Sequence, residues 1–161
     1  MAWTESGLYA NALAASLGVS GGTLNWLSTT NKFFLTNTSD APNYAASLAS
    51  SIYAVTNEVT GTGWAAGGIA VSALAAGSAS IAPSFTITGP GPSVTEWQAS
   101  NISVASTTLS GILGGYFYST TATANYKLIG IYFGGTAYAT VAGTFAVTWS
   151  SSNIATITCA A

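Results

Sequence analysis

Short runs of β-branched and aromatic residues, bounded by glycine, asparagine, serine or proline, fill the chain from Ile69 to its end. The clearest run is Thr144 to Trp149, in which large apolar residues alternate with smaller ones. Alternation with a period of two is the pattern of a strand with one buried face. The runs recur roughly every 8–12 residues, which is typical of an antiparallel sandwich or barrel.

The sequence therefore predicts a mainly β fold, an antiparallel β-sandwich or barrel of roughly eight short strands. A hairpin is expected across Ala142-Gly143, and the two prolines of Gly89 to Pro92 are expected to interrupt the sheet. The predicted strand segments are 69–74, 81–88, 94–100, 102–104, 112–119, 126–133, 137–141, 144–149 and 154–159.

The N-terminal third is predicted to hold one or two short helices. Apolar residues at three- and four-residue spacing predict the first helix from Glu5 to Leu17, and a weaker pattern predicts a second over Tyr44 to Val55. Between them, Thr23 to Thr36 has the composition of a strand, and Asn37 to Asn43 that of a turn.

Charge is scarce along the whole chain. Of 161 residues only 4% are charged, against about 25% in a typical soluble domain. Flat strands with so little charge template further pairing unless something covers them, and another protein is the simplest cover. We therefore expect a single β-rich domain over residues 1–161, with residues 1–22 as an N-terminal contact segment. The six charged residues are Glu5, Lys32, Asp40, Glu58, Glu96 and Lys127.

This composition argues against several classes of function. Two separated lysines cannot neutralise a phosphate backbone, so we expect no nucleic-acid partner. With no histidine and with Cys159 as the single cysteine, we expect no metal, no cofactor and no catalytic residues. The most apolar window, Trp64 to Ile81, is interrupted by glycines, so we expect no membrane helix. The first twenty residues lack a basic leader, which predicts synthesis in a cytoplasm.

The stretch from Asn57 to Gly68 is the candidate site of the chain. Its glycines permit a tight backbone that positions Trp64, with Glu58 at the mouth of the turn. One interpretation is a loop that contacts another protein; the other is a connector whose tryptophan covers the domain's own core. The residues predicted to make protein contacts are Trp3, Asn57, Glu58, Gly61, Gly63 and Trp64.

Three chemical alternatives to this interpretation are a glycosidase pair, a phosphate-binding loop and tryptophans that bind sugars. Glu58 and Glu96 would act as a glycosidase pair only if a cleft held them about 5–9.5 Å apart. The glycines from Gly61 to Gly67 lack the spacing and the lysine of a phosphate-binding loop. The tryptophans would stack on sugar rings if exposed and form the core if buried.

Four short stretches carry a resemblance to a known family: Met1 to Thr4, Asp40 to Asn43, Asn57 to Trp64 and Gly143 to Trp149. Together they resemble the small capsid decoration and minor structural proteins of tailed bacteriophages, particularly those that infect actinobacteria. The family offers no catalytic residues to carry over.

The resemblance implies a virion structural protein, made in the host cytoplasm and bound to the outer head surface, where it stabilises the capsid. Its expected partners are the major capsid protein and further copies of itself, with a trimer favoured. The alternative is a tail or fibre component that binds host-surface glycans. An enzyme acting on cell-wall polymers would depend on Glu58 or Glu96.

Overall fold

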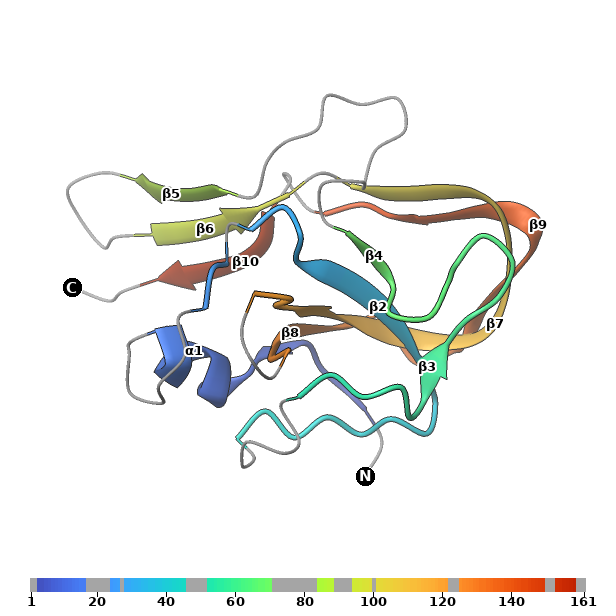
Figure 1. Ribbon diagram of the computed structural model, residues 1–161, viewed down its shortest axis with the longest axis horizontal. Helices are drawn as coiled ribbons and strands as arrows, with labels where there is room; N and C mark the ends of the chain where they lie inside the picture. The colour runs from blue at the N-terminus through green and yellow to red at the C-terminus, as the bar shows by residue number, and fades with distance from the viewer. Residues whose placement is uncertain are drawn as a thin grey trace.

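The computed structural model describes residues 3–16, 24–26, 28–45, 52–70, 84–88, 94–99, 101–121, 125–149 and 153–158. Within these residues the chain forms two antiparallel sheets and one short helix (Figure 1). The elements are β1 Gly7–Leu8, α1 Ala10–Ser16, β2 Lys32–Asn37, β3 Glu58–Val59, β4 Ile69–Ala70, β5 Ser84–Thr88, β6 Val94–Gln98, β7 Ile102–Tyr118, β8 Lys127–Tyr132, β9 Tyr138–Val147 and β10 Asn153–Thr158.

The larger sheet has the strand order β1-β8-β7-β2-β3, with β4 also paired to β2 and β9 also paired to β7. The smaller sheet has the order β10-β6-β5. The predicted mainly β, antiparallel fold is confirmed. The larger sheet does not close on itself, so the sandwich alternative describes the arrangement better than the barrel.

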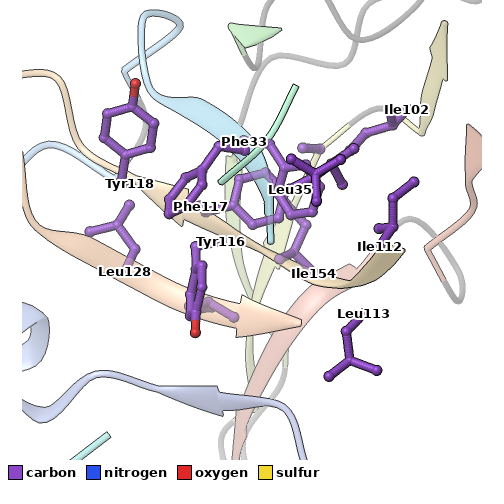
Figure 2. Close-up of a cluster of buried hydrophobic side chains, with 14 of the residues drawn as sticks. Phe33, Leu35, Ile102, Ile112, Leu113, Tyr116, Phe117, Tyr118, Leu128 and Ile154 are labelled. Atoms are coloured by element: carbon purple, nitrogen blue, oxygen red, sulfur yellow. The ribbon is translucent and has the colours of Figure 1, made fainter. Parts of the chain in front are cut away.

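Both sheets contribute to one buried cluster. Trp97 of β6 meets Phe117 of β7 edge to face, with ring centroids 5.1 Å apart. Ile154 of β10 is buried in the same cluster, and Figure 2 shows it among side chains of β2 and β7. The apolar sequence Phe33-Phe34-Leu35 suits β2 to an interior place in the sheet, between β7 and β3, because all three side chains are fully buried.

The long strand β7 organises the larger sheet and bends as it does so. Its C-terminal half pairs with β2 and β8, and its N-terminal half pairs with β9. Positive φ angles at Ser106 (57°), Gly111 (72°) and Ala142 of β9 (48°) accompany shifts in the β7–β9 register. Such bulges bend a strand pair without ending it.

These bulges correct two predictions. Segments 102–104 and 112–119 are parts of one strand, because the intervening residues remain paired with β9. The hairpin across Ala142-Gly143 is wrong, since the residues on both sides of that dipeptide pair with β7 and not with each other. Thr107 fixes this bulge: its Oγ1 lies 2.8 Å from Thr140 Oγ1 and donates to Gly143 O at 3.1 Å.

The N-terminal helix is shorter than predicted. Gly7 and Leu8 pair with Gly130 and Ile129 of β8, so the helix begins only at Ala10. The predicted strand 23–36 is confirmed only from Lys32 onward.

The second predicted helix and the predicted break at 89–92 lie partly or wholly outside the described residues. At the end of the second predicted helix, Ile52 forms a bridge with Tyr126 instead. Residues 46–51 of that helix, the break at 89–92 and Cys159 lie outside the described residues.

Candidate functional site

The Asn57–Gly68 loop leaves the larger sheet at β3 and returns to it at β4. Asn57 takes a positive φ of 66°, and its carbonyl oxygen accepts a hydrogen bond from Asn37 N at 3.0 Å. Glu58 and Val59 then pair with Thr36 and Leu35 of β2. The start of the loop is therefore an extension of the sheet.

Glu58 holds the two ends of the loop together. Its Oε1 accepts a hydrogen bond from Gly67 N at 2.7 Å, and its Oε2 accepts one from the Tyr53 hydroxyl at 2.8 Å. The Tyr118 hydroxyl donates to Gly67 O at 2.8 Å. Both carboxylate oxygens are thus occupied by groups of the same chain, so Glu58 has a structural role here.

The two tyrosines at the base of the loop, Tyr53 and Tyr118, form a stacked pair. The rings of Tyr53 and Tyr118 lie 4.6 Å apart with an angle of 11° between their planes. Burial raises the pKa of Tyr118 to about 12, and the charge of Glu58 adds to the shift. The pKa of Tyr53 is also raised, by burial first and then by its hydrogen bond to Glu58. Both phenols therefore stay protonated and remain donors at neutral pH.

The tip of the loop is a tight turn from Gly61 to Trp64. These two residues exchange backbone hydrogen bonds of 3.0 Å, and Gly63 has a φ of 77°, a conformation that suits glycine. Thr62 O accepts a hydrogen bond from Thr108 N of β7 at 3.1 Å. The turn is therefore fastened to β7, on the edge opposite β9.

Trp64 belongs to the core. Its side chain is 1% exposed and meets Phe145 of β9 edge to face, with centroids 5.4 Å apart. Of the two interpretations of this loop, the structure agrees with a tryptophan that covers the domain's own core. The indole does not present a face to solvent, so any contact surface here consists of its neighbours.

Those neighbours form a surface that we call the neutral platform. Exposed residues of the loop tip lie beside exposed residues of the N-terminal half of β7, joined by the Thr62–Thr108 bridge. Every member is small or polar and none is ionisable, so recognition here would depend on shape, backbone groups and hydroxyls. The platform consists of Thr60, Gly61, Thr62, Gly63, Ala65, Ala66, Ser103, Ala105, Ser106, Thr108 and Ser110.

Trp3 lies in the interior as well. It is 3% exposed, and its Nε1 donates to Glu5 O at 2.7 Å and to the Tyr44 hydroxyl at 3.0 Å. Of the residues predicted to make contacts, Trp3 and Trp64 are thus buried, whereas Gly61 and Gly63 are exposed. Asn57 and Glu58 are partly exposed beneath the platform.

A second polar cluster surrounds Tyr116. Its hydroxyl donates to Asp40 Oδ2, and Lys127 Nζ lies 4.4 Å from its ring centroid. Burial lowers the pKa of Lys127, while the charge of Asp40 acts in the opposite direction. The cluster keeps two of the six charges close to aromatic side chains, away from the platform.

The proposed carboxylate pair is split between the sheets. Glu58 is on β3 of the larger sheet, and Glu96 is on β6, opposite Thr86 and Thr156 in the smaller sheet. With both oxygens of Glu58 engaged, this carboxylate is not presented to a substrate. The described ranges contain no group of three or more histidine, cysteine or acidic residues suited to a metal, and no helix long and apolar enough to span a membrane.

Sequence reasoning missed a pocket on the concave side of β9. Its volume is about 270 Å³, and the Tyr138 hydroxyl at its rim donates to Phe133 O at 3.1 Å. No local pattern indicates it, because its lining combines Phe133 and Tyr138 with residues about ten positions later in the chain. The pocket is lined by Phe133, Tyr138, Phe145, Ala146, Val147 and Thr148.

Comparisons of the chain with protein families, with curated proteins and with solved structures give no match. Function is therefore inferred from the residues and their arrangement.

Proposed function

We propose that this chain is a structural protein of a tailed-bacteriophage virion, an accessory subunit that binds the outer surface of the head and braces contacts between major capsid subunits. The observation that supports this proposal best is the neutral platform, a rigidly fastened and uncharged surface. The resemblance of four stretches of the sequence to capsid decoration proteins gives the class of partner. In this proposal the protein acts by binding, without catalysis.

The construction of the loop suits a binding surface. Glu58, Tyr53 and Tyr118 hold its base, and Trp64 anchors its tip in the core. A loop fixed in this way loses little conformational freedom when a partner binds, so more of the contact energy remains as affinity.

The absence of charge has an energetic consequence. Burying an ionised side chain costs several kcal/mol unless a partner group compensates, and the platform carries none. The alanines and threonine methyl groups of the platform would contribute about 25 cal/mol for each Å² of apolar surface removed from water, before the costs of association. Many copies on one shell would add such contacts, which is how an accessory subunit would brace a capsid against internal pressure.

The glycan-binding alternative loses its main support. It requires tryptophan or tyrosine rings exposed for stacking on sugars. Trp3, Trp64, Trp97 and Trp149 are buried, and Trp26 is partly buried against Trp97. Tyr138, at 51% exposed, is the one exposed tyrosine of the described residues, and a single ring offers little stacking surface for a glycan chain. We therefore retain the capsid role as the single proposal.

The test compares phage particles that contain the protein with particles that lack it. We expect particles without it to release DNA at lower temperature and after milder osmotic shock, and added purified protein to restore resistance. Particles that survive both treatments equally well in its absence would show that the bracing role is wrong.

The platform itself is tested with a matched pair of variants. Thr62→Glu places a charge on the platform, whereas Thr38→Glu places the same charge on an exposed turn next to β2. We expect the first variant to bind particles at least about tenfold more weakly, a difference of about 1.4 kcal/mol, and the second to bind normally. Equal binding by both would locate the capsid contact elsewhere.

A further inference from the structure

The outer edge of β9 is the longest unpaired strand edge among the described residues. β9 runs for ten residues, Tyr138–Val147, and pairs with β7 along one edge. No described strand pairs with its other edge. A strand edge presents a row of backbone donors and acceptors that a second extended segment can satisfy.

This edge lacks the features that normally prevent such pairing. Proteins protect edge strands with lysines, prolines or very short strands, and β9 has neither charge nor proline. Its bulge at Ala142 is the one protective feature, and it is held in a fixed geometry by Thr107 and by Ala142 N donating to Thr108 Oγ1 at 3.1 Å. The strand is therefore an ordered template on either side of the bulge.

β9 carries two exposed apolar side chains and lines an apolar pocket. Val141 is 84% exposed, the highest value among the large apolar side chains of the described residues, and Tyr138 is 51% exposed. The pocket beside them has a volume of about 270 Å³. Small-molecule sites usually measure roughly 300–1,000 Å³, so this recess suits one or two side chains of another polypeptide.

We propose that β9 is a self-association site, at which the β9 edges of two copies of this chain pair antiparallel about a two-fold axis. In a two-fold interface every residue near the axis faces its own counterpart, so a charged residue there would meet the same charge. A strand without charge avoids this repulsion. The composition of β9 therefore suits pairing with the same strand of a second copy. Val141 of each copy would then cover apolar surface of the other.

This inference uses a different strand edge from the capsid contact, and the two surfaces meet only at Thr108, whose Oγ1 accepts a hydrogen bond from Ala142 N of β9. The loop tip joins β7 at Thr108, whereas β9 pairs with the other edge, with Gly143 opposite Thr107. The inference also specifies a dimer in place of the trimer expected from the sequence, since two identical strand edges pair in twos.

The experiment is analytical ultracentrifugation of the full chain over a range of concentrations. We expect a monomer–dimer equilibrium, and we expect Val141→Lys to raise the dissociation constant at least about tenfold. Val55→Lys is the matched control, because Val55 is 68% exposed and lies outside β9; this variant should dimerise like the unchanged protein. Far-UV circular dichroism of both variants would establish that they are folded.

Three results would overturn the inference: a monomer at every concentration, a trimer, or a dimer that Val141→Lys and Val55→Lys weaken equally. Hydrogen exchange gives a second measure, since backbone amides of β9 should become more protected as the dimer forms. Protection gained in the loop tip instead of β9 would also contradict it. Val141→Lys and Thr62→Glu separate the two proposals, because the first should impair dimerisation directly and the second should impair only particle binding.

Discussion

The indole of Trp3 lies flat against the ring of Tyr116, with centroids 4.9 Å apart and planes inclined by 9°. Gly114 makes this contact possible, since a Cβ at that position would collide with the six-membered ring of Trp3. The stack joins the N-terminal segment to the C-terminal half of β7. The contact role expected for residues 1–22 is thus accompanied by a role within the fold.

Replacing Trp3 should therefore destabilise the whole protein. We expect Trp3→Ala to lower the free energy of unfolding by about 3–5 kcal/mol, as is usual for a buried tryptophan. Trp3→Phe should cost less, because it keeps a ring against Tyr116 and loses the indole donor to Glu5 O and Tyr44. Chemical denaturation followed by fluorescence measures both. A Trp3→Ala variant as stable as the unchanged protein would contradict the stacked arrangement.

The hydrogen bond between Glu58 and the Tyr53 hydroxyl predicts that the stability effects of replacing these two side chains are coupled. Glu58→Ala leaves Gly67 N and the Tyr53 hydroxyl without their acceptor, so we expect a loss of about 1–3 kcal/mol. Tyr53→Phe removes only one of the two bonds and should cost less. The double variant should cost less than the sum of the single variants, because both remove the same hydrogen bond.

Denaturation of all three variants gives the coupling energy directly. Thr60→Ala is the control, since Thr60 is an exposed neighbour of Glu58 and should change stability by less than about 0.5 kcal/mol. Strict additivity of Glu58→Ala and Tyr53→Phe would show that the two side chains are not bonded in solution.

Strands could be predicted from the sequence where a local pattern of residues was compatible with only one structure. Alternation in 144–149 marks the C-terminal part of β9, because a half-buried strand needs period two whatever its partner. The Ala142-Gly143 dipeptide was ambiguous, since small residues that permit a turn also permit a bulge. β7 decided between them by pairing with both sides. Similarly, Gly7 and Leu8 fit a helix by periodicity, but β8 offers their backbone a strand partner.

The loop was predictable in its conformation and not in its environment. Glycine content indicates a tight turn at Gly61 to Gly63, because the backbone requirement is local. Glu58 accepts hydrogen bonds from Tyr53 and from Gly67 N, and Tyr118 donates to Gly67 O. No sequence spacing relates Tyr118 to the loop. Burial of Trp3 depends on the missing side chain of Gly114, more than a hundred positions away. Such contacts follow from topology and cannot be read from a local pattern.

The buried tyrosines predict a loss of stability at alkaline pH. Burial raises the pKa of Tyr44 and Tyr118 to about 12, whereas the unfolded chain has the ordinary value of about 10. Between these values the unfolded state binds fewer protons than the folded state, so the free energy of unfolding falls as pH rises. Stability should be constant from neutral pH to about 10 and then decrease through about 12.

Thermal unfolding at a series of pH values, together with ultraviolet absorbance of tyrosinate, measures this dependence. Tyr118→Phe is the matched variant, because it removes one titrating hydroxyl and keeps the ring against Tyr53. Its stability should decline less steeply above pH 10. A midpoint that does not fall above pH 10, or tyrosinate absorbance from these residues near pH 10 while the protein is still folded, would contradict the raised pKa values.

Alanine substitutions at Gly68 and Gly111, which have similar φ angles, distinguish the cost of backbone strain from the cost of a steric clash. Gly68 has a φ of 67° and Gly111 a φ of 72°, so alanine at either position adopts an unfavourable left-handed conformation that costs about 1–2 kcal/mol. At Gly111 a Cβ would meet no atom within 4 Å, whereas at Gly68 it would collide with the carbonyl group of Phe33. The second contact is with the backbone of β2 and cannot be relieved by turning a side chain.

We therefore expect Gly111→Ala to lower the free energy of unfolding by about 1–2 kcal/mol, and Gly68→Ala to lower it clearly further. Gly68→Ala should also detach the loop from β2, which hydrogen exchange would show as lost protection at Ile69 and Ala70 of β4. Denaturation of the two variants under the same conditions gives the difference. Equal losses would mean that the loop end does not approach Phe33 this closely, and the rigid base required for the neutral platform would then be missing.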